Sequence, residues 1–226
     1  GGLDSGNRPV WGATIDSLPP EAVSEEGNRY LFAYRPTLTF TSKDLTKTYG
    51  EDVTDLLADP DPDRYTVSGI EPGVPGAFLG DTLETAFIGK PFLTSDGAAA
   101  DADVTPGGYA IIIEGGIETD YNVVFVSTGV LTVEPKRLTV EGITAESREY
   151  DGTTVVSLNV ADAYLVGEIE DGDAVELIFT SPFGSLANKD VGVNKAVTVN
   201  GVTLDGPDSH NYVLEFAGVT ATISVR

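Results

Sequence analysis

One pattern of residues occurs twice in the later two thirds of the chain, and this repeat limits the folds that the chain can adopt. Each copy has a Thr-rich segment, then Tyr-Gly or Tyr-Asp-Gly, and much later an aromatic segment and a Thr/Val segment. In the first copy these segments are 38–41, 49–50, 121–125 and 130–133, and in the second they are 138–140, 150–152, 211–216 and 221–225. A period of about a hundred residues indicates two similar modules.

The residue pattern inside the copies is typical of β-strands. Short runs of β-branched and aromatic residues are interrupted by Gly, Pro, Asp and Asn, and strict alternation at 197–199 and 219–225 places apolar side chains on one face. We therefore predict an all-β fold with two tandem Ig-like β-sandwiches, at residues 37–135 and 136–226, after a lead-in at 1–36 that ends in a connecting strand. The border falls near Pro135. A closed barrel is the alternative, because closure leaves no local mark on a sequence.

Shorter segments carry local predictions. The aromatic residues of 30–34 alternate, which predicts the connecting strand, and Trp11 before them is expected to be a buried packing anchor. Residues 52–57 and 162–166 are the helix-like segments, each about one turn long. The tight turn that begins each module is predicted at Tyr49, Gly50, Tyr150, Asp151 and Gly152, since glycine adopts positive φ without strain.

The charge of the chain excludes some classes of partner. The formal net charge is −23, and no segment is basic, so the cationic surface that nucleic acids and anionic membranes require is missing. The apolar runs, such as 109–113, are too short to insert into a membrane, where a spanning helix needs about 20 residues. The sequence has no cysteine, which excludes disulfides and thiolate ligands.

Carboxylates are abundant enough to raise the question of a metal site. Asp59, Asp61 and Asp63 have the spacing of the first ligands of a calcium loop. An EF-hand is excluded, because position six of that loop is Arg64 instead of glycine and position twelve is Ile70 instead of glutamate. Two looser calcium sites are possible. One would combine the first loop with acidic residues of 96–103, such as Asp101 and Asp103, and the other would lie at 171–173. Solvated acidic loops without a cofactor are the favoured interpretation, and calcium is the alternative.

Nothing in the sequence points to catalysis. His210 is the single histidine, and the Gly-x-Ser-x-Gly motif that would supply a nucleophile is absent. A glycosidase needs two carboxylates across a cleft, and modules of this size offer no insertion to form one. We therefore expect a non-enzymatic protein with no catalytic residue.

Several motifs resemble known families. The second module resembles the YDG domain at Tyr150-Asp151-Gly152-Thr153-Thr154, Asn188-Lys189-Asp190-Val191-Gly192 and Asn211-Tyr212. The first resembles the related MBG domain at Lys47-Thr48-Tyr49-Gly50, Gly108-Tyr109-Ala110-Ile111 and Tyr121-Asn122-Val123-Val124-Phe125. The lead-in is similar to the segment that precedes such modules in filamentous-haemagglutinin-like exoproteins.

The resemblance implies a fragment of a large adhesin, secreted or anchored at the surface of a Gram-negative outer membrane. Its modules would act as a stalk or spacer, or as a surface for polysaccharide, matrix or cell attachment, beside further repeats of the parent chain. The alternative is a calcium-dependent ligand-binding module. Because the acidic loops at 59–63 and 96–103 distinguish the first module from the second, any module-specific binding is expected there.

Overall fold

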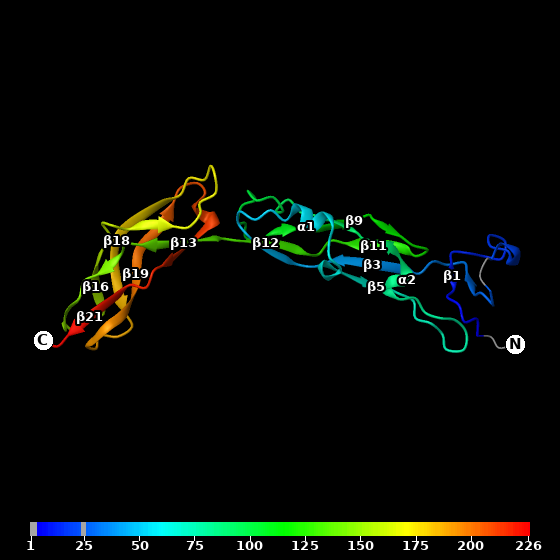
Figure 1. The fold of residues 1–226 in the computed structure, drawn as a ribbon, viewed down its shortest axis with the longest axis horizontal. Helices are drawn as coiled ribbons and strands as arrows, with labels where there is room; N and C mark the ends of the chain where they lie inside the picture. The colour runs from blue at the N-terminus through cyan, green and yellow to red at the C-terminus, as the bar shows by residue number, and fades with distance from the viewer. Residues whose placement is uncertain (1–3, 24–25) are drawn as a thin grey trace. The chain divides into compact units, whose positions relative to one another are not determined.

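The computed structural model describes residues 4–23 and 26–226, and it divides into two compact units (Figure 1). The first unit holds the described residues up to Lys47 and Glu51–Val133, and the second holds Thr48–Gly50 and Glu134–Arg226. Residues 1–3 and 24–25 of the predicted lead-in lie outside the described residues, and the rest of the lead-in is part of the first unit.

Strands dominate both units, so the predicted all-β class is confirmed. The first unit contains β1 (Val10–Trp11), β2 (Leu31–Phe32), β3 (Thr37–Ser42), β4 (Leu45–Thr48), β5 (Tyr65–Ser68), β6 (Ile88–Gly89), β7 (Phe92–Thr94), β8 (Tyr109–Ala110), β9 (Ile112–Glu114), β10 (Ile117–Glu118), β11 (Asn122–Val126) and β12 (Val130–Glu134). The last residues of β4 and β12, Thr48 and Glu134, belong to the second unit. Its helical turns are η1 (Pro20–Ala22), α1 (Thr54–Ala58), η2 (Pro62–Arg64) and α2 (Leu83–Ala86).

The second unit is built from longer strands. These are β13 (Lys136–Glu141), β14 (Thr144–Ala145), β15 (Arg148–Glu149), β16 (Val155–Asn159), β17 (Tyr164–Val166), β18 (Glu176–Leu186), β19 (Gly192–Asp205), β20 (Tyr212–Phe216) and β21 (Thr220–Ser224), with the turn η3 (Ser209–Asn211). One sheet has the order β17-β13-β20, and the other has the order β14-β16-β18-β19-β21-β15. The antiparallel pair β18–β19 forms the centre of the larger sheet.

The same three-stranded arrangement occurs in each unit. In the first, β3 pairs in parallel with β11 and antiparallel with β5, and in the second, β13 pairs in parallel with β20 and antiparallel with β17. The register also corresponds, since Phe40 lies opposite Phe125 and Val140 lies opposite Phe216. The two late aromatic segments of the sequence repeat therefore occupy equivalent places beside the first strand of each module.

Alternation along the first strand of each module builds the two cores. Leu38 and Phe40 of β3 are fully buried, as are Leu138 and Val140 of β13. Because successive side chains of a strand point to opposite faces, these pairs lie on one side of their sheets. The first core is rich in aromatic rings around Phe40, whereas the second is mainly aliphatic.

Local predictions had different outcomes. The helix-like segment 52–57 contains most of α1, whereas the helix predicted at 162–166 is wrong, because Tyr164–Val166 is a strand that pairs with β13 and satisfies its backbone there. The predicted strand at 30–34 shortens to β2. The sequence analysis did not predict helix α2, although Thr82 and Thr85 form a reciprocal capping box at its start.

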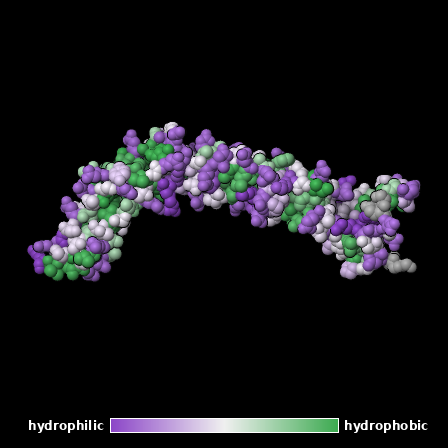
Figure 2. Space-filling model, in the orientation of Figure 1, coloured by the Kyte–Doolittle hydropathy of each residue, from purple (hydrophilic) through white to green (hydrophobic). Residues whose placement is uncertain are grey.

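The surface is mostly hydrophilic, with apolar patches that Figure 2 shows on both units. Among the residues that the structure describes, no helix is long and apolar enough to cross a membrane.

Candidate functional site

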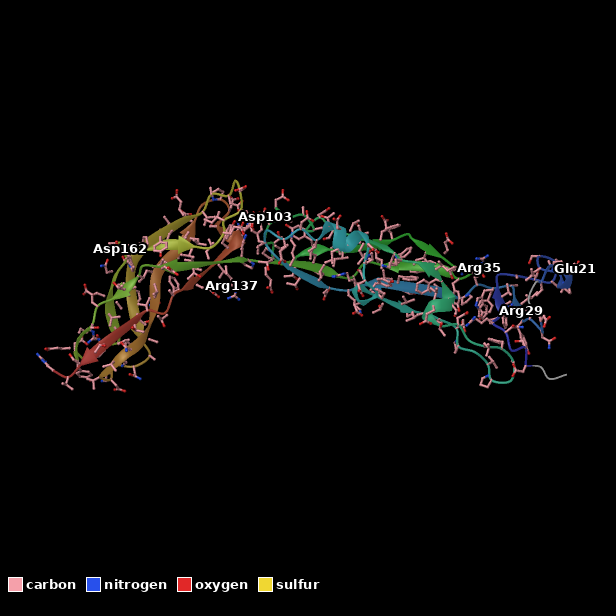
Figure 3. All side chains as sticks on the ribbon, viewed as in Figure 1. Glu21, Arg29, Arg35, Asp103, Arg137 and Asp162 are labelled. Atoms are coloured by element: carbon pink, nitrogen blue, oxygen red, sulfur yellow. The ribbon has the colours of Figure 1, made fainter. Side chains whose placement is uncertain are left out.

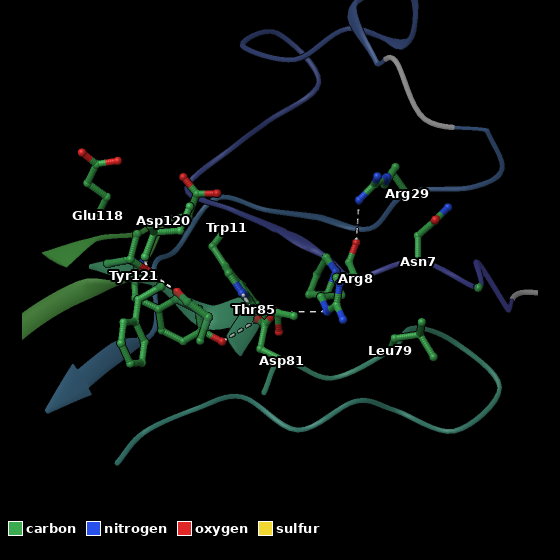
Figure 4. Close-up of a pocket in the computed structure, with 16 residues that line it drawn as sticks. Asn7, Arg8, Trp11, Arg29, Leu79, Asp81, Thr85, Glu118, Asp120 and Tyr121 are labelled. Atoms are coloured by element: carbon green, nitrogen blue, oxygen red, sulfur yellow. Dashed lines mark hydrogen bonds and ion pairs between the residues drawn. The ribbon is translucent and has the colours of Figure 1, made fainter. Parts of the chain in front are cut away.

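A buried carboxylate with aromatic donors is the most organised polar feature of the first unit (Figure 4). The hydroxyl of Tyr121 donates a hydrogen bond to Asp81 Oδ2 at 2.7 Å, and Trp11 Nε1 donates to the same oxygen at 3.2 Å. Arg8 Nε lies 3.7 Å from Asp81 Oδ1, and the Asp81 side chain is only 7% exposed. The Tyr121 hydroxyl also accepts a hydrogen bond from the backbone N–H of Glu71 at 3.2 Å.

These contacts explain how a carboxylate is tolerated in this place. Burying an unpaired charge is costly, and a nearby guanidinium and two hydrogen bonds offset that cost. Burial raises the pKa of Tyr121, and its hydrogen bond to the negatively charged Asp81 raises this pKa further. The rings of Trp11 and Tyr121 meet edge-on with centroids 6.0 Å apart, which is a favourable aromatic geometry.

The second unit contains the same arrangement around Asp173. The hydroxyl of Tyr212 donates to Asp173 Oδ2 at 2.6 Å and accepts from the backbone N–H of Glu170 at 2.8 Å. Tyr49, which belongs to this unit, donates from its hydroxyl to the same carboxylate at 3.0 Å. The rings of Tyr49 and Tyr212 meet edge-on, with centroids 5.5 Å apart. Burial raises the pKa of Tyr212, and the hydrogen bond to Asp173 raises this pKa further.

The second aromatic donor of each cluster comes from an aromatic–glycine pair. Trp11 is followed by Gly12 at φ +67°, and Tyr49 is followed by Gly50 at φ +91°. Positive φ favours glycine, so both pairs form a turn that leaves the aromatic side chain pointing into the cluster. We name the two groups the Tyr–Asp clusters: Trp11, Asp81 and Tyr121 in the first unit, and Tyr49, Asp173 and Tyr212 in the second.

The sequence analysis recognised the tyrosines of the repeat but missed Asp81, and it considered Asp173 only as part of a possible calcium site at 171–173. The signal was available, because Asp81 precedes Tyr121 by 40 residues and Asp173 precedes Tyr212 by 39. Aligning the two copies through their late tyrosines would have brought these aspartates almost into register. With acidic residues so frequent in the chain, the correspondence does not stand out unless the copies are aligned.

A polar cleft of about 550 Å³ lies beside the cluster of the first unit (Figure 4). Asn7, Arg8 and Arg29 of the lead-in face Thr85 and Asp120 across it. The guanidinium of Arg8 contacts Asp81 through Nε alone, and its two terminal amino groups form no hydrogen bond with any described residue. Guanidinium, amide and carboxylate groups around one cleft can hydrogen-bond the paired hydroxyl groups of a sugar or a carboxylate.

The turn residues of the second copy lie at an end of the second unit. Gly152 has φ +81°, and Asp151 Oδ1 accepts a hydrogen bond from the backbone N–H of Thr153 at 2.8 Å. Asp151 is also paired with Arg148 at 2.6 Å. Tyr150 packs partly buried against the second core.

The candidate calcium ligands of the first acidic loop have other partners. Asp59 forms an ion pair with Lys90 at 2.8 Å, and Asp61 accepts a hydrogen bond from the backbone N–H of Asp63 at 3.0 Å. Asp61 and Asp63 also line a cleft of about 290 Å³ together with Lys43 and Arg64, which supply positive charge there. This arrangement balances the acidic charge with cationic side chains.

The second acidic loop is more firmly packed than its composition indicates. Asp101 and Asp103 are exposed, as Figure 3 shows for Asp103, but Gly97 and Ala98 between β7 and β8 are buried. In the part of the chain that the structure describes, no three side chains of His, Asp or Glu come together as metal ligands.

Lys47, which the sequence analysis named only as part of the Lys47–Gly50 motif, holds this second loop. The residue is 2% exposed, and its ammonium donates to the backbone carbonyls of Glu51 and Ala99. Burial lowers the pKa of Lys47, while the negative charges of Asp52 and Asp101 act in the opposite direction. Because its ammonium is enclosed by carbonyl oxygens, Lys47 links the segment at Glu51 to the loop at Ala99.

The remaining candidate for chemistry, His210, is exposed on η3, with Nδ1 3.1 Å from the carbonyl oxygen of Pro207.

Comparison with known proteins identifies one part of the chain. Residues 134–222 match the family model of the YDG domain, so the similarity that the motifs of the second module predict is confirmed. The matched residues include Tyr150, Asp173 and Tyr212. No curated protein and no solved structure is significantly similar to the chain.

Proposed function

We propose that the chain is a non-enzymatic part of a secreted or surface-anchored bacterial adhesin. In this proposal two Ig-like modules, the first related to the MBG domain and the second to the YDG domain, act as a spacer at the cell surface. The observation that supports the proposal best is the recurrence of the Tyr–Asp cluster in both units. The match of residues 134–222 to the YDG domain is consistent with it.

The chemistry of the clusters favours a structural role over a catalytic one. A catalytic acid or base must exchange a proton with a substrate. Asp81 and Asp173 instead accept hydrogen bonds from aromatic side chains of their own units, and both tyrosines are buried. Each tyrosine hydroxyl also ties down the backbone N–H of a glutamate in a preceding loop. Such a group stabilises a module and repeats wherever the module repeats.

Surface labelling of intact source cells tests the adhesin part of the proposal. Antibodies raised against the chain should bind intact cells or the culture medium, and protease treatment of intact cells should remove the cell-bound signal. A cytoplasmic protein serves as the control for lysis. A signal that appears only after lysis would contradict the proposal.

A second candidate function is attachment to polysaccharide through the cleft of the first unit. It is favoured by the unengaged amino groups of Arg8, which face polar residues of a cleft large enough for a sugar unit. Screening the chain on a glycan array tests it, with Arg8→Gln expected to abolish any hit. Arg137→Gln is the matched control, because Arg137 is an exposed arginine of the second unit, paired with Glu215. An array without hits, or hits that survive Arg8→Gln, would leave the spacer role alone.

A further inference from the structure

We propose that the end of the second unit around Tyr150 is a docking surface for a further β module that carries its own Tyr–Asp pair. This inference rests on the proposed role as tandem modules. In it, Tyr150 would serve the next module as Tyr49 serves Asp173 and Tyr212.

The turn at Tyr150 is built like the turn at Tyr49. The backbone N–H of Tyr49 donates to the carbonyl oxygen of Glu134, the last residue of β12, at 2.8 Å. The backbone N–H of Tyr150 donates to Ser224, the last residue of β21, at 2.9 Å. In both turns an aspartate shortly after the tyrosine accepts a backbone hydrogen bond at 2.8 Å, from Thr54 in one and Thr153 in the other.

The strand register extends this correspondence. Strand β13 begins at Lys136, two residues after Glu134, and Lys136 lies opposite Tyr212. The same offset from Ser224 leads to Arg226. A module whose first strand began there would place its late tyrosine opposite that position. Its Tyr–Asp pair would therefore lie next to Tyr150, as Tyr212 and Asp173 lie next to Tyr49.

The two tyrosines differ in how far their bonding is satisfied. Tyr49 is 4% exposed and its hydroxyl is bonded to Asp173. Tyr150 is only partly buried, and its hydroxyl forms no hydrogen bond with any of the described residues. A tyrosine that combines an apolar ring with an unsatisfied hydroxyl is well suited to an interface whose acceptor comes from a partner.

Apolar side chains around Tyr150 complete the surface. Val193 is 76% exposed, Val225 is 75% exposed, and Val191 is 49% exposed. They lie near this end of the unit because Gly192, between two of them, pairs with Ile223 of β21. Figure 2 shows apolar surface at the end that carries the C-terminus. The partner that fits is a β module with a carboxylate acceptor bordered by an apolar rim.

The test extends the full chain by a second copy of residues 137–226, placed directly after Arg226. Hydrogen exchange, read by mass spectrometry, is compared between the original and the extended chain. We expect exchange in residues 149–153 to slow roughly fivefold or more on extension, the effect of about one added hydrogen bond. The Tyr150→Phe variant should abolish this slowing, and so should Asp→Asn in the added copy at the position equivalent to Asp173. Tyr164→Phe, which removes an exposed hydroxyl of the same unit, is the matched control and should leave it intact.

Unchanged exchange on extension, or slowing that survives both substitutions, would overturn the proposal. Peptides of the added copy report whether it has folded. If it has not, a double-mutant cycle of Tyr49→Phe and Asp173→Asn in the 226-residue chain decides. Absence of coupling between these two residues would remove the contact on which the proposed role of Tyr150 is based. The surface-labelling result is independent, so failure of the adhesin proposal and failure of the docking proposal are distinguishable.

Discussion

At the scale of single residues, the two Tyr–Asp clusters stabilise an aspartate carboxylate with different hydrogen-bond donors. Tyr49 approaches both oxygens of Asp173, at 3.0 and 3.2 Å, whereas the indole of Trp11 has one N–H and reaches only Oδ2 of Asp81. In the first unit Arg8 lies beside the other oxygen. Each carboxylate therefore has a favourable neighbour at both oxygens, and for Asp81 this makes a side-chain exposure of 7% tolerable.

Replacing the carboxylate should reveal how much the second cluster stabilises its unit. We expect Asp173→Asn to lower the free energy of unfolding of the second unit by about 1–3 kcal/mol, because hydrogen bonds to a charged acceptor are lost or weakened. Urea denaturation measures this change. Asp171→Asn is the matched control, an exposed aspartate two residues away. An equal loss in both variants would argue against a specific role of the cluster.

The tyrosines of the clusters also predict a dependence of stability on pH. The pKa values of Tyr121 and Tyr212 are raised in the folded state, so their contribution to stability is complete below the unfolded pKa of about 10. It is lost as pH rises through that value toward the folded pKa, because only the unfolded state then releases the protons. We expect the free energy of unfolding to fall above about pH 10, and to fall less steeply in Tyr212→Phe. Parallel curves for the variant and the parent would contradict this.

At the scale of the element, the sequence predicted where strands occur better than which strands pair with each other. Alternation identified the strand patterns at 197–199 and 219–225, where Val197, Ala221 and Ile223 are buried, since one buried face requires a period of two. It could not show that β3 and β13 pair in parallel with strands far along the chain, because periodicity carries no information about the partner. Residues 162–166 were predicted as helix because so short a segment does not distinguish the helical period from the strand period. Pairing with β13 determines that Tyr164–Val166 is a strand.

The Lys47 link gives a prediction at this scale. Lys47→Met keeps most of the apolar stem but removes the ammonium from the carbonyls of Glu51 and Ala99. We expect a loss of about 2 kcal/mol in the free energy of unfolding of the first unit, together with faster hydrogen exchange in residues 96–103. Lys43→Met is the matched control, because Lys43 is exposed and donates to a single carbonyl, that of Asp63. Equal effects of the two variants would show that the buried ammonium is not special.

At the scale of the whole molecule, the sequence predicts a border near Pro135, and the second compact unit consists of Thr48–Gly50 and Glu134–Arg226. That Thr48–Gly50 also belongs to the second unit could not be predicted. The Tyr-Gly turn was recognisable from its glycine, but the acceptor of the Tyr49 hydroxyl lies 124 residues away. Local turn chemistry identifies a turn and leaves its long-range partner undetermined.

The net charge of −23 leads to a prediction that also tests the calcium alternative. Repulsion among like charges destabilises a compact state. Salt weakens this repulsion, because the Debye length falls from about 10 Å at 0.1 M to about 3 Å at 1 M. We therefore expect the unfolding midpoint to rise with sodium chloride. Calcium should raise it no further at matched ionic strength, because Asp59 is already paired with Lys90 and Asp61 caps η2. An additional rise with calcium that Asp61→Asn or Asp101→Asn reduces would instead establish the calcium-dependent module, since a ligand bound only by the native state must stabilise it.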